Sequence, residues 1–192
     1  MKKLKFLLIT ALLAFACKGF SADGLHVADI IIAPGETRTI SVELNNPDDT
    51  YIMLDFWMQL PEGVSIDKDD EGELLVVQNS DRFTKTHILE VAEQGNNCYK
   101  VLIYSSRNAA IKGNSGELFS MTITASSSSA NGNYQGRIYS QVFSNEARQE
   151  YNPSDLTFNI TIDKPELKGD INGDGKVTIA DVTALVNIIL GK

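Results

Sequence analysis

Apolar and polar residues alternate in short runs between residues 23 and 163, and clusters of turn-forming residues separate these runs. Because the side chains of a β-strand point alternately to opposite faces, this alternation predicts strands. Nine runs follow the pattern: 25–32, 37–44, 52–60, 74–78, 87–92, 99–105, 117–125, 136–143 and 156–162. Nine strands without crossover helices predict a mainly β fold, an antiparallel jelly-roll-like β-sandwich, followed by a short C-terminal loop and helix.

The run 52–60 shows how such a strand divides core from surface. Its apolar face comprises Ile52, Leu54, Phe56, Met58 and Leu60. Asp55, Trp57 and Gln59 share the opposite, mainly polar face. There the only tryptophan of the chain either packs under a loop or beside the C-terminal segment, or stacks against a ligand such as a sugar ring. Most other aromatic residues in strands are expected to fill the core, namely Phe56, Tyr104, Phe119, Phe143 and Phe158.

Residues 1–22 have the features of a secretory signal peptide. Lysines at positions 2 and 3 precede an apolar stretch, 4–16, that is shorter than the ~20 residues needed to span a bilayer. Cys17 follows Ala16 directly, so the signal either directs lipid attachment at Cys17 or is simply cleaved near Ala16 or Ala22. We expect an exported protein without a membrane span, extracellular or in the cell envelope (the periplasm or the outer-membrane surface).

The chain is acidic, with a formal net charge of -8, and removal of the four lysines in residues 1–22 brings the charge to about -12. Such a surface repels nucleic acids and anionic lipids and attracts cations. Cys98 is the only cysteine besides Cys17, so no intramolecular disulfide forms once Cys17 is lipidated or removed. The sandwich, about 140 residues long, must therefore rest on its hydrophobic core.

Residues 164–168, with a proline among charged residues, predict an extended linker. The segment 169–192 contains the twelve residues D-I-N-G-D-G-K-V-T-I-A-D at 170–181. Such EF-hand loops bind calcium through oxygen ligands at positions 1, 3, 5, 7, 9 and 12, with glycine at position 6 for a sharp turn. The predicted ligands are the side chains of Asp170, Asn172, Asp174, Thr178 and Asp181 and the backbone carbonyl of Lys176. The alternative is an acidic turn before a helix, with Asp181 facing the helix dipole.

A helix is predicted after the loop, because apolar residues recur at helical spacing and Gly191 is placed to end it. The apolar residues are Val182, Leu185, Val186 and Ile189. Residues 169–191, G-D-I-N-G-D-G-K-V-T-I-A-D-V-T-A-L-V-N-I-I-L-G, resemble one repeat of a dockerin, the calcium-dependent plug of cellulosome-type assemblies. In that family position 12 of the loop is typically aspartate, as Asp181 is here. Dockerins normally carry two such repeats packed against each other, whereas this segment contains one.

The region 25–162 resembles a cohesin, one of the nine-stranded jelly-roll sandwiches that receive dockerins. The resemblance rests on the order of three stretches: P-G-E-T-R-T-I-S-V-E-L-N-N, L-D-F-W-M-Q-L-P-E-G-V and G-N-S-G-E-L-F-S-M-T-I. It implies that 52–60 is a strand of the partner-binding sheet. Asp55, Trp57 and Gln59 would then lie on a surface that binds a protein partner or a glycan.

Catalytic motifs such as H-E-x-x-H and G-x-S-x-G are missing from the sequence, and its two histidines, His26 and His87, are far apart. We therefore expect a non-catalytic protein. The short final helix is marginal alone in water, so it must dock on its own sandwich, on another copy or on a separate receptor. The sequence predicts a calcium-binding protein that docks with a cohesin- or dockerin-like partner in a polysaccharide-degrading or surface assembly. The alternative is a carbohydrate-binding module of a glycan-utilisation system.

Overall fold

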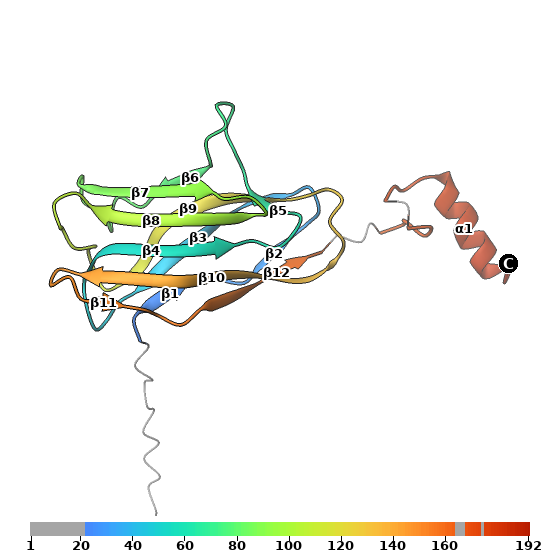
Figure 1. Cartoon of the computed structure of the whole chain (residues 1–192). Helices are drawn as coiled ribbons and strands as arrows, with labels where there is room; N and C mark the ends of the chain where they lie inside the picture. Colours follow the sequence, from blue (N-terminus) through green and yellow to red (C-terminus); the bar gives the residue numbers. More distant parts are fainter. Residues whose placement is uncertain (1–21, 164–167, 174) are drawn as a thin grey trace, which may run out of the picture.

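Two packed β-sheets and a C-terminal helix make up the computed structural model, which describes residues 22–163, 168–173 and 175–192 (Figure 1). The predicted signal peptide up to residue 21, the possible lipid attachment site Cys17, most of the predicted linker and the predicted ligand Asp174 lie outside these residues. Within the described ranges, no helix combines the length and the apolar character that crossing a membrane requires.

One sheet has five strands and the other has seven. The five-stranded sheet has the order β1 (Gly24–His26), β3 (Thr37–Asn45), β9 (Ser115–Ala125) and β5 (Val64–Ile66), and β6 (Val76–Gln78) also pairs with β9. The seven-stranded sheet has the order β2 (Ile30–Ile32), β12 (Leu156–Ile162), β10 (Gly132–Asn145), β4 (Tyr51–Gln59), β8 (Cys98–Ser105) and β7 (His87–Glu93), and β11 (Glu150–Tyr151) pairs with β10. The two sheets lie face to face (Figure 1).

This architecture confirms the predicted mainly β sandwich with one short C-terminal helix, α1 (Ile179–Ile189). Each of the nine predicted runs overlaps at least one strand. The first run is divided, because after β1 the chain crosses to the seven-stranded sheet and forms β2 there. One strand pair departs from the antiparallel arrangement at this edge, where β2 pairs with β12 in parallel. The short strands β5 and β11 were not predicted, since two or three residues are too few to show an alternation.

Asp29, the residue before β2, is hydrogen-bonded to Asn159 of β12. Its carboxylate accepts hydrogen bonds from the side-chain amide of Asn159 (3.0 Å) and from the backbone N–H of the same residue (2.8 Å). These bonds favour the charged form and lower the pKa of Asp29 below its ordinary value. Because the shift is downward, the stabilisation is present above the ordinary aspartate pKa and is lost as the pH falls through the lowered pKa.

We expect an NMR titration of the Asp29 carboxyl group to give a midpoint below that of an aspartate in the unfolded chain. In Asn159→Ala the side-chain bond is lost while the backbone bond can remain, so the midpoint should move upward towards the ordinary value. The same midpoint in both proteins would contradict this account of the edge.

The core lies between the two sheets and takes every second residue of the long strands. The predicted core aromatics that are buried are Phe56, Phe119, Phe143 and Phe158. The prediction for Tyr104 is wrong. Its neighbours Ile103 and Ser105 are buried, so the pleat of β8 turns Tyr104 outward, where its hydroxyl donates to Glu90 (3.2 Å).

Gly136 faces the ring of Phe158 at a place that has no room for a side chain. The two residues are direct neighbours across β10 and β12, and a Cβ atom on Gly136 would lie 2.2 Å from the Phe158 ring. We expect Gly136→Ala to lower the free energy of unfolding by about 1–3 kcal/mol, because the buried ring must move. Chemical denaturation measures this loss. Gly24→Ala is the control, since its Cβ atom meets nothing closer than 4.0 Å, and an equally small loss in both variants would contradict the prediction.

Candidate functional site

A row of aromatic and charged side chains crosses the outer face of the seven-stranded sheet. Trp57 of β4 lies directly opposite Tyr139 of β10 on one side and opposite Lys100 of β8 on the other. Asp55 and Arg137 stand two residues before Trp57 and Tyr139 on the same two strands, and therefore share this face. We call these five residues the aromatic strip.

The members of the aromatic strip contact one another. The rings of Trp57 and Tyr139 are nearly parallel, at 21° and with 6.4 Å between their centroids. The ammonium group of Lys100 lies 5.0 Å from the centroid of the Trp57 ring and forms an ion pair with Asp55. The guanidinium carbon of Arg137 lies 4.2 Å from the centroid of the Tyr139 ring. Stacked rings and cation–π contacts hold these side chains in fixed positions before any partner arrives.

A β-bulge in β10 follows Tyr139 directly. Between Tyr139 and Val142 the register against β4 shifts, and Ser140 takes a positive φ of 51°. The extra residue lets Gln141 turn inward, where its buried amide donates to the carbonyl of Ser154 (2.6 Å). Bulges of this kind re-aim a side chain and increase the local twist. The bulge therefore turns Gln141 and Phe143 toward the core, while Tyr139, paired with Trp57 in the regular stretch before it, stays on the outer face.

Gln59, the third predicted surface residue of β4, has a structural role at the end of the strand. Its amide donates to the backbone carbonyl of Asn96 (2.6 Å) and to that of Leu60 (3.0 Å). Asn96 belongs to the turn between β7 and β8 and has a positive φ of 52°. The structure thus brings Asp55 and Trp57 together with other charged and aromatic groups, while Gln59 holds the neighbouring turn.

The outer face of the five-stranded sheet has a different chemistry. Its central rows pair Thr37 with Thr124, Thr39 with Thr122 and Ser41 with Ser120. The hydroxyl groups of Thr37 and Thr124 are hydrogen-bonded to each other at 3.0 Å. Short hydroxyl side chains suit a solvated sheet, whereas Trp, Tyr and Arg dominate the energetics of protein interfaces. The two outer faces therefore differ in their capacity to bind a partner, and the seven-stranded sheet carries the stronger candidate.

The second candidate site is the loop before α1. Asp181 is only 3% exposed, and its carboxylate accepts hydrogen bonds from the backbone N–H groups of Ile171 (2.8 Å), Asn172 (3.3 Å) and Thr178 (2.6 Å). These bonds, led by that from Thr178, lower the pKa of Asp181 against the opposing effect of burial. The carboxylate of Asp170 accepts from the N–H of Gly175 (2.7 Å). Both carboxylates therefore point into the loop, as a ligand shell requires.

Helix α1 begins at Ile179, within the last three residues of the predicted loop. Thr178 caps the helix by accepting from the N–H of Ala180 (3.2 Å), and Asp181 closes the capping box with the N–H of Thr178. The oxygen groups fit calcium, a hard cation that takes carboxylate, amide and carbonyl oxygens. Within the residues described here, no three His, Cys, Asp or Glu side chains gather to hold a metal ion. The third carboxylate of the predicted loop, Asp174, lies outside those residues.

The apolar side chains of α1 are exposed. Six of them range from 43% exposed at Leu185 to 79% at Ile179, the others being Val182, Val186, Ile188 and Ile189, and the C-cap residue Leu190 is 59% exposed. Asp181 is the only charged residue of the helix, and it is buried. A short helix with this surface buries little in the described structure, so it gains stability when another surface covers it.

The sandwich matches solved cohesin structures along nearly their whole length. The seventh type I cohesin of ScaB from Pseudobacteroides cellulosolvens has a TM-score of 0.63 at 14% identity, covering 76% of this chain and 95% of its own. The sandwich has the cohesin fold. A non-cellulosomal cohesin from Archaeoglobus fulgidus gives a TM-score of 0.56 at 16% identity, with 73% and 92% covered. A chain of a type I cohesin–dockerin complex from Clostridium thermocellum gives 0.58 at 15% identity, with 74% and 100% covered. The sequence matches no protein-family model and no curated protein.

In this cohesin-fold sandwich, sequence reasoning found only part of the aromatic strip. It selected Asp55 and Trp57 from the alternation in β4. The same alternation in β8, where Tyr99 and Val101 are buried, places Lys100 on the outer face and was available as a signal. Tyr139 could not be placed in this way, because the bulge that follows it interrupts the alternation of β10.

Proposed function

We propose that this chain is a non-catalytic docking protein whose cohesin-fold sandwich binds a calcium-loaded loop-and-helix segment through the aromatic strip. The segment would be of the kind that residues 168–192 of this chain form. The observation that carries the proposal is the composition of the strip: Trp57, Tyr139 and Arg137 are the residue types that most often dominate binding at protein interfaces. One of the matched structures, from Clostridium thermocellum, is a cohesin–dockerin complex.

A binding role fits the charges of the strip better than a catalytic role. Lys100 is paired with Asp55, and Arg137 lies 3.9 Å from the carboxylate of Asp155. Each of these charges therefore already has a partner of opposite sign. They are suited to orienting a partner, since charged pairs at an interface contribute mainly to specificity and to the rate of association.

Calcium would be held by residues 170–181. The ligands would be the side chains of Asp170, Asn172, Asp174, Thr178 and Asp181 and the backbone carbonyl of Lys176. The bound ion would offset the repulsion among three carboxylates and fix the loop against the first turn of α1. Calcium would therefore control whether the segment presents an ordered helix to a partner.

Helix α1 would supply the apolar surface that the partner covers. The aromatic strip offers the half-buried rings of Trp57 and Tyr139, and exposed aliphatic side chains pack well against such rings. An exported or envelope protein of this type would act in a polysaccharide-degrading or surface assembly, as its signal-like N-terminus and its fold suggest.

A glycan-binding function is the second candidate, because the nearly parallel rings of Trp57 and Tyr139 could stack against sugar rings. However, a cation lies over each ring, Lys100 over Trp57 and Arg137 over Tyr139. One face of each ring is therefore already covered, which favours a protein partner that replaces or extends these contacts.

Trp57 itself can distinguish the two functions, because it is the only tryptophan. We would titrate a chain ending at Asp163, which retains the whole core of the sandwich, and record the tryptophan fluorescence. A peptide of residues 168–192 with calcium should change the emission, and soluble oligosaccharides should not. If an oligosaccharide changed the emission and the peptide did not, the glycan-binding function would replace the docking function.

A further inference from the structure

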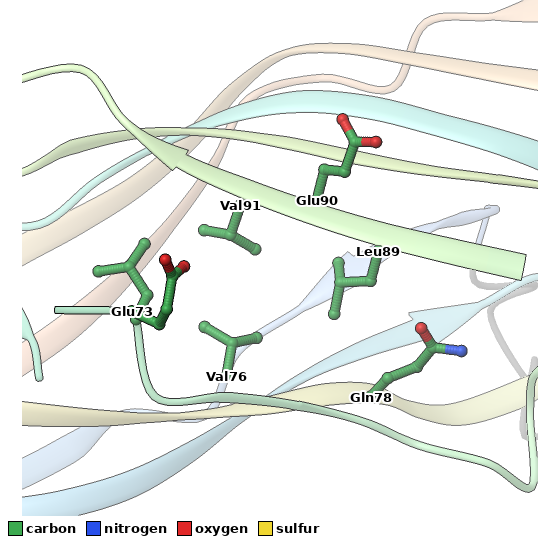
Figure 2. Close-up of a pocket in the computed structure, with 7 residues that line it drawn as sticks. Glu73, Val76, Gln78, Leu89, Glu90 and Val91 are labelled. Atoms are coloured by element: carbon green, nitrogen blue, oxygen red, sulfur yellow. The ribbon is translucent and has the colours of Figure 1, made fainter. Parts of the chain in front are cut away.

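The open edge of the sandwich, between β6 and β7, contains a groove of about 370 Å³. Its wall is formed by the half-buried apolar side chains of Leu74, Val76, Leu89 and Val91. Figure 2 shows Val76, Leu89 and Val91 gathered between the two strands, while the carboxylate of Glu90 points to the other side of β7. This groove is separate from the aromatic strip, and its chemistry is independent of the function proposed above.

The backbone of β7 is available for pairing at this edge. Ser106 donates its N–H to the carbonyl of Thr86 (2.9 Å), and Gln94 donates to that of Cys98 (2.8 Å). These two bonds show that the even-numbered residues of β7 are the ones hydrogen-bonded to β8. The N–H and C=O groups of Leu89 and Val91 therefore point away from β8, toward the open edge, as expected for the last strand of a sheet.

The backbone of β6 faces the same groove from the other sheet. The carbonyl of Leu75 accepts from the N–H of Thr122 (3.0 Å), and Asn79 donates to the carbonyl of Leu118 (2.8 Å). Odd-numbered residues of this segment therefore pair with β9, and the backbone of Gln78 faces the groove. The edges of β6 and β7 thus flank one apolar groove. An extended peptide bound in this groove could form hydrogen bonds with the backbone groups of either edge.

Exposed apolar side chains also lie on β6, just before it and on β7, next in sequence to residues that line the groove. Leu75, Val77 and Ile88 are 37%, 67% and 39% exposed, and in the described part of the sandwich only Ile31 and Tyr151 are other large apolar residues with comparable exposure. Apolar surface concentrated at an unpaired strand edge marks a site for an added strand, because both the backbone groups and the side chains gain a partner there.

The acidic side chains beside the groove indicate which kind of segment can bind there. Glu73 and Glu90 line the groove, and Glu90 accepts from the hydroxyl of Tyr104. The nearby cation Lys68, which interacts electrostatically with Glu73, is itself ion-paired with Glu93, so acidic groups outnumber basic ones here. Two copies of this chain would bring like charges together here, which opposes pairing between copies. A segment with Lys or Arg side chains would instead neutralise the rim.

We propose that this groove binds an extended segment of a partner protein in which apolar residues alternate with Lys or Arg, added as a strand beside β7. The alternation of β7 requires this pattern. Leu89 and Val91 face the groove and Glu90 faces outward, so the added strand turns its apolar side chains inward and its basic side chains toward Glu90.

The probe for this site is a capped, fluorescently labelled hexapeptide in which valine and lysine alternate, titrated into the full chain and followed by fluorescence anisotropy. Two control peptides separate the contributions: one carries glutamate in place of lysine, and the other carries N-methylated valines that cannot pair with a strand. We expect both control peptides to bind at least about 10-fold more weakly than the probe, since each removes one of the two attractions.

Two substitutions test the site in the protein. Glu90→Lys reverses the charge beside the groove on an exposed side chain, and Glu146→Lys makes the same change in a distant exposed turn. Val91→Pro removes an N–H that faces the open edge and leaves the pairing with β8 intact. We expect Glu90→Lys and Val91→Pro to weaken binding of the probe at least about 10-fold, and Glu146→Lys to leave it nearly unchanged.

Equal weakening by Glu90→Lys and Glu146→Lys would overturn the proposal, because binding would then follow net charge alone. Concentration-dependent dimerisation of the chain that Val91→Pro abolishes would also overturn it, since a second copy would then cover the edge. Failure of the aromatic strip to bind a calcium-loaded segment would leave this test unaffected.

Discussion

Trp57→Ala should weaken binding of a calcium-loaded loop-and-helix segment at least about 30-fold, equivalent to ~2 kcal/mol. Trp57 stands at the centre of the aromatic strip, between Tyr139 and Lys100, so its removal takes away the largest apolar surface of the face. It also leaves Lys100 without its cation–π contact. Surface plasmon resonance with an immobilised peptide of residues 168–192 measures the change.

Ile31→Ala is the matched control for this prediction. Ile31 is a large apolar residue, 62% exposed, on β2 at the far edge of the same sheet. Trp57→Phe keeps a ring in place and should lose less affinity than Trp57→Ala. Because Trp57 lies on the outer face, thermal unfolding should change little in either variant. Equal affinities for Trp57→Ala and Ile31→Ala would show that the strip is not the binding surface.

Asp181→Ala should weaken calcium binding by the chain at least about 100-fold. In the proposed site this carboxylate closes the calcium loop, and in the structure it also accepts three backbone hydrogen bonds, from Ile171, Asn172 and Thr178. The substitution therefore removes a charge and loosens the loop at once. Calorimetric titration of the full chain with calcium measures the affinity, and circular dichroism at 222 nm reports any loss of α1.

Asp181→Asn removes the charge and keeps one oxygen, which can accept either the bonds from Ile171 and Asn172 or the bond from Thr178, so part of the hydrogen bonding is retained. We expect Asp181→Asn to retain the helix and to bind calcium more weakly than the native chain. Asp170→Ala should also weaken binding, since Asp170 occupies the first position of the loop. Native calcium affinity in both alanine variants would exclude residues 170–181 as the metal site.

The strands were predictable because most of them are long and have one buried face. In β4, the residues from Ile52 to Gln59 alternate cleanly, so the sequence places Phe56 inside and Trp57 outside. Helix α1 was predictable for a different reason, since the contacts at its start are local: Thr178 and Asp181 form a capping box three residues apart. Short-range patterns of this kind do not depend on contacts with distant parts of the chain.

The remaining features depend on contacts between distant parts of the chain. The bulge after Tyr139 changes which residues of β10 face the core, from Ile138 before it to Phe143 after it, and no local alternation shows where it falls. Arg82 falls in a turn cluster where an arginine is normally solvated, yet it is buried and donates to Asn46 (2.8 Å) and to the carbonyl of Gly116 (3.0 Å). The groove between β6 and β7 likewise needs both sheets in place, so no local pattern predicts it.

The most direct test of the central claim is calorimetry between a chain ending at Asp163 and a peptide of residues 168–192, first with calcium and then with a chelator. The account predicts binding in calcium, loss of binding with the chelator, and loss of binding in calcium for Trp57→Ala. Calcium uptake by the peptide without any heat of binding to the sandwich would contradict it.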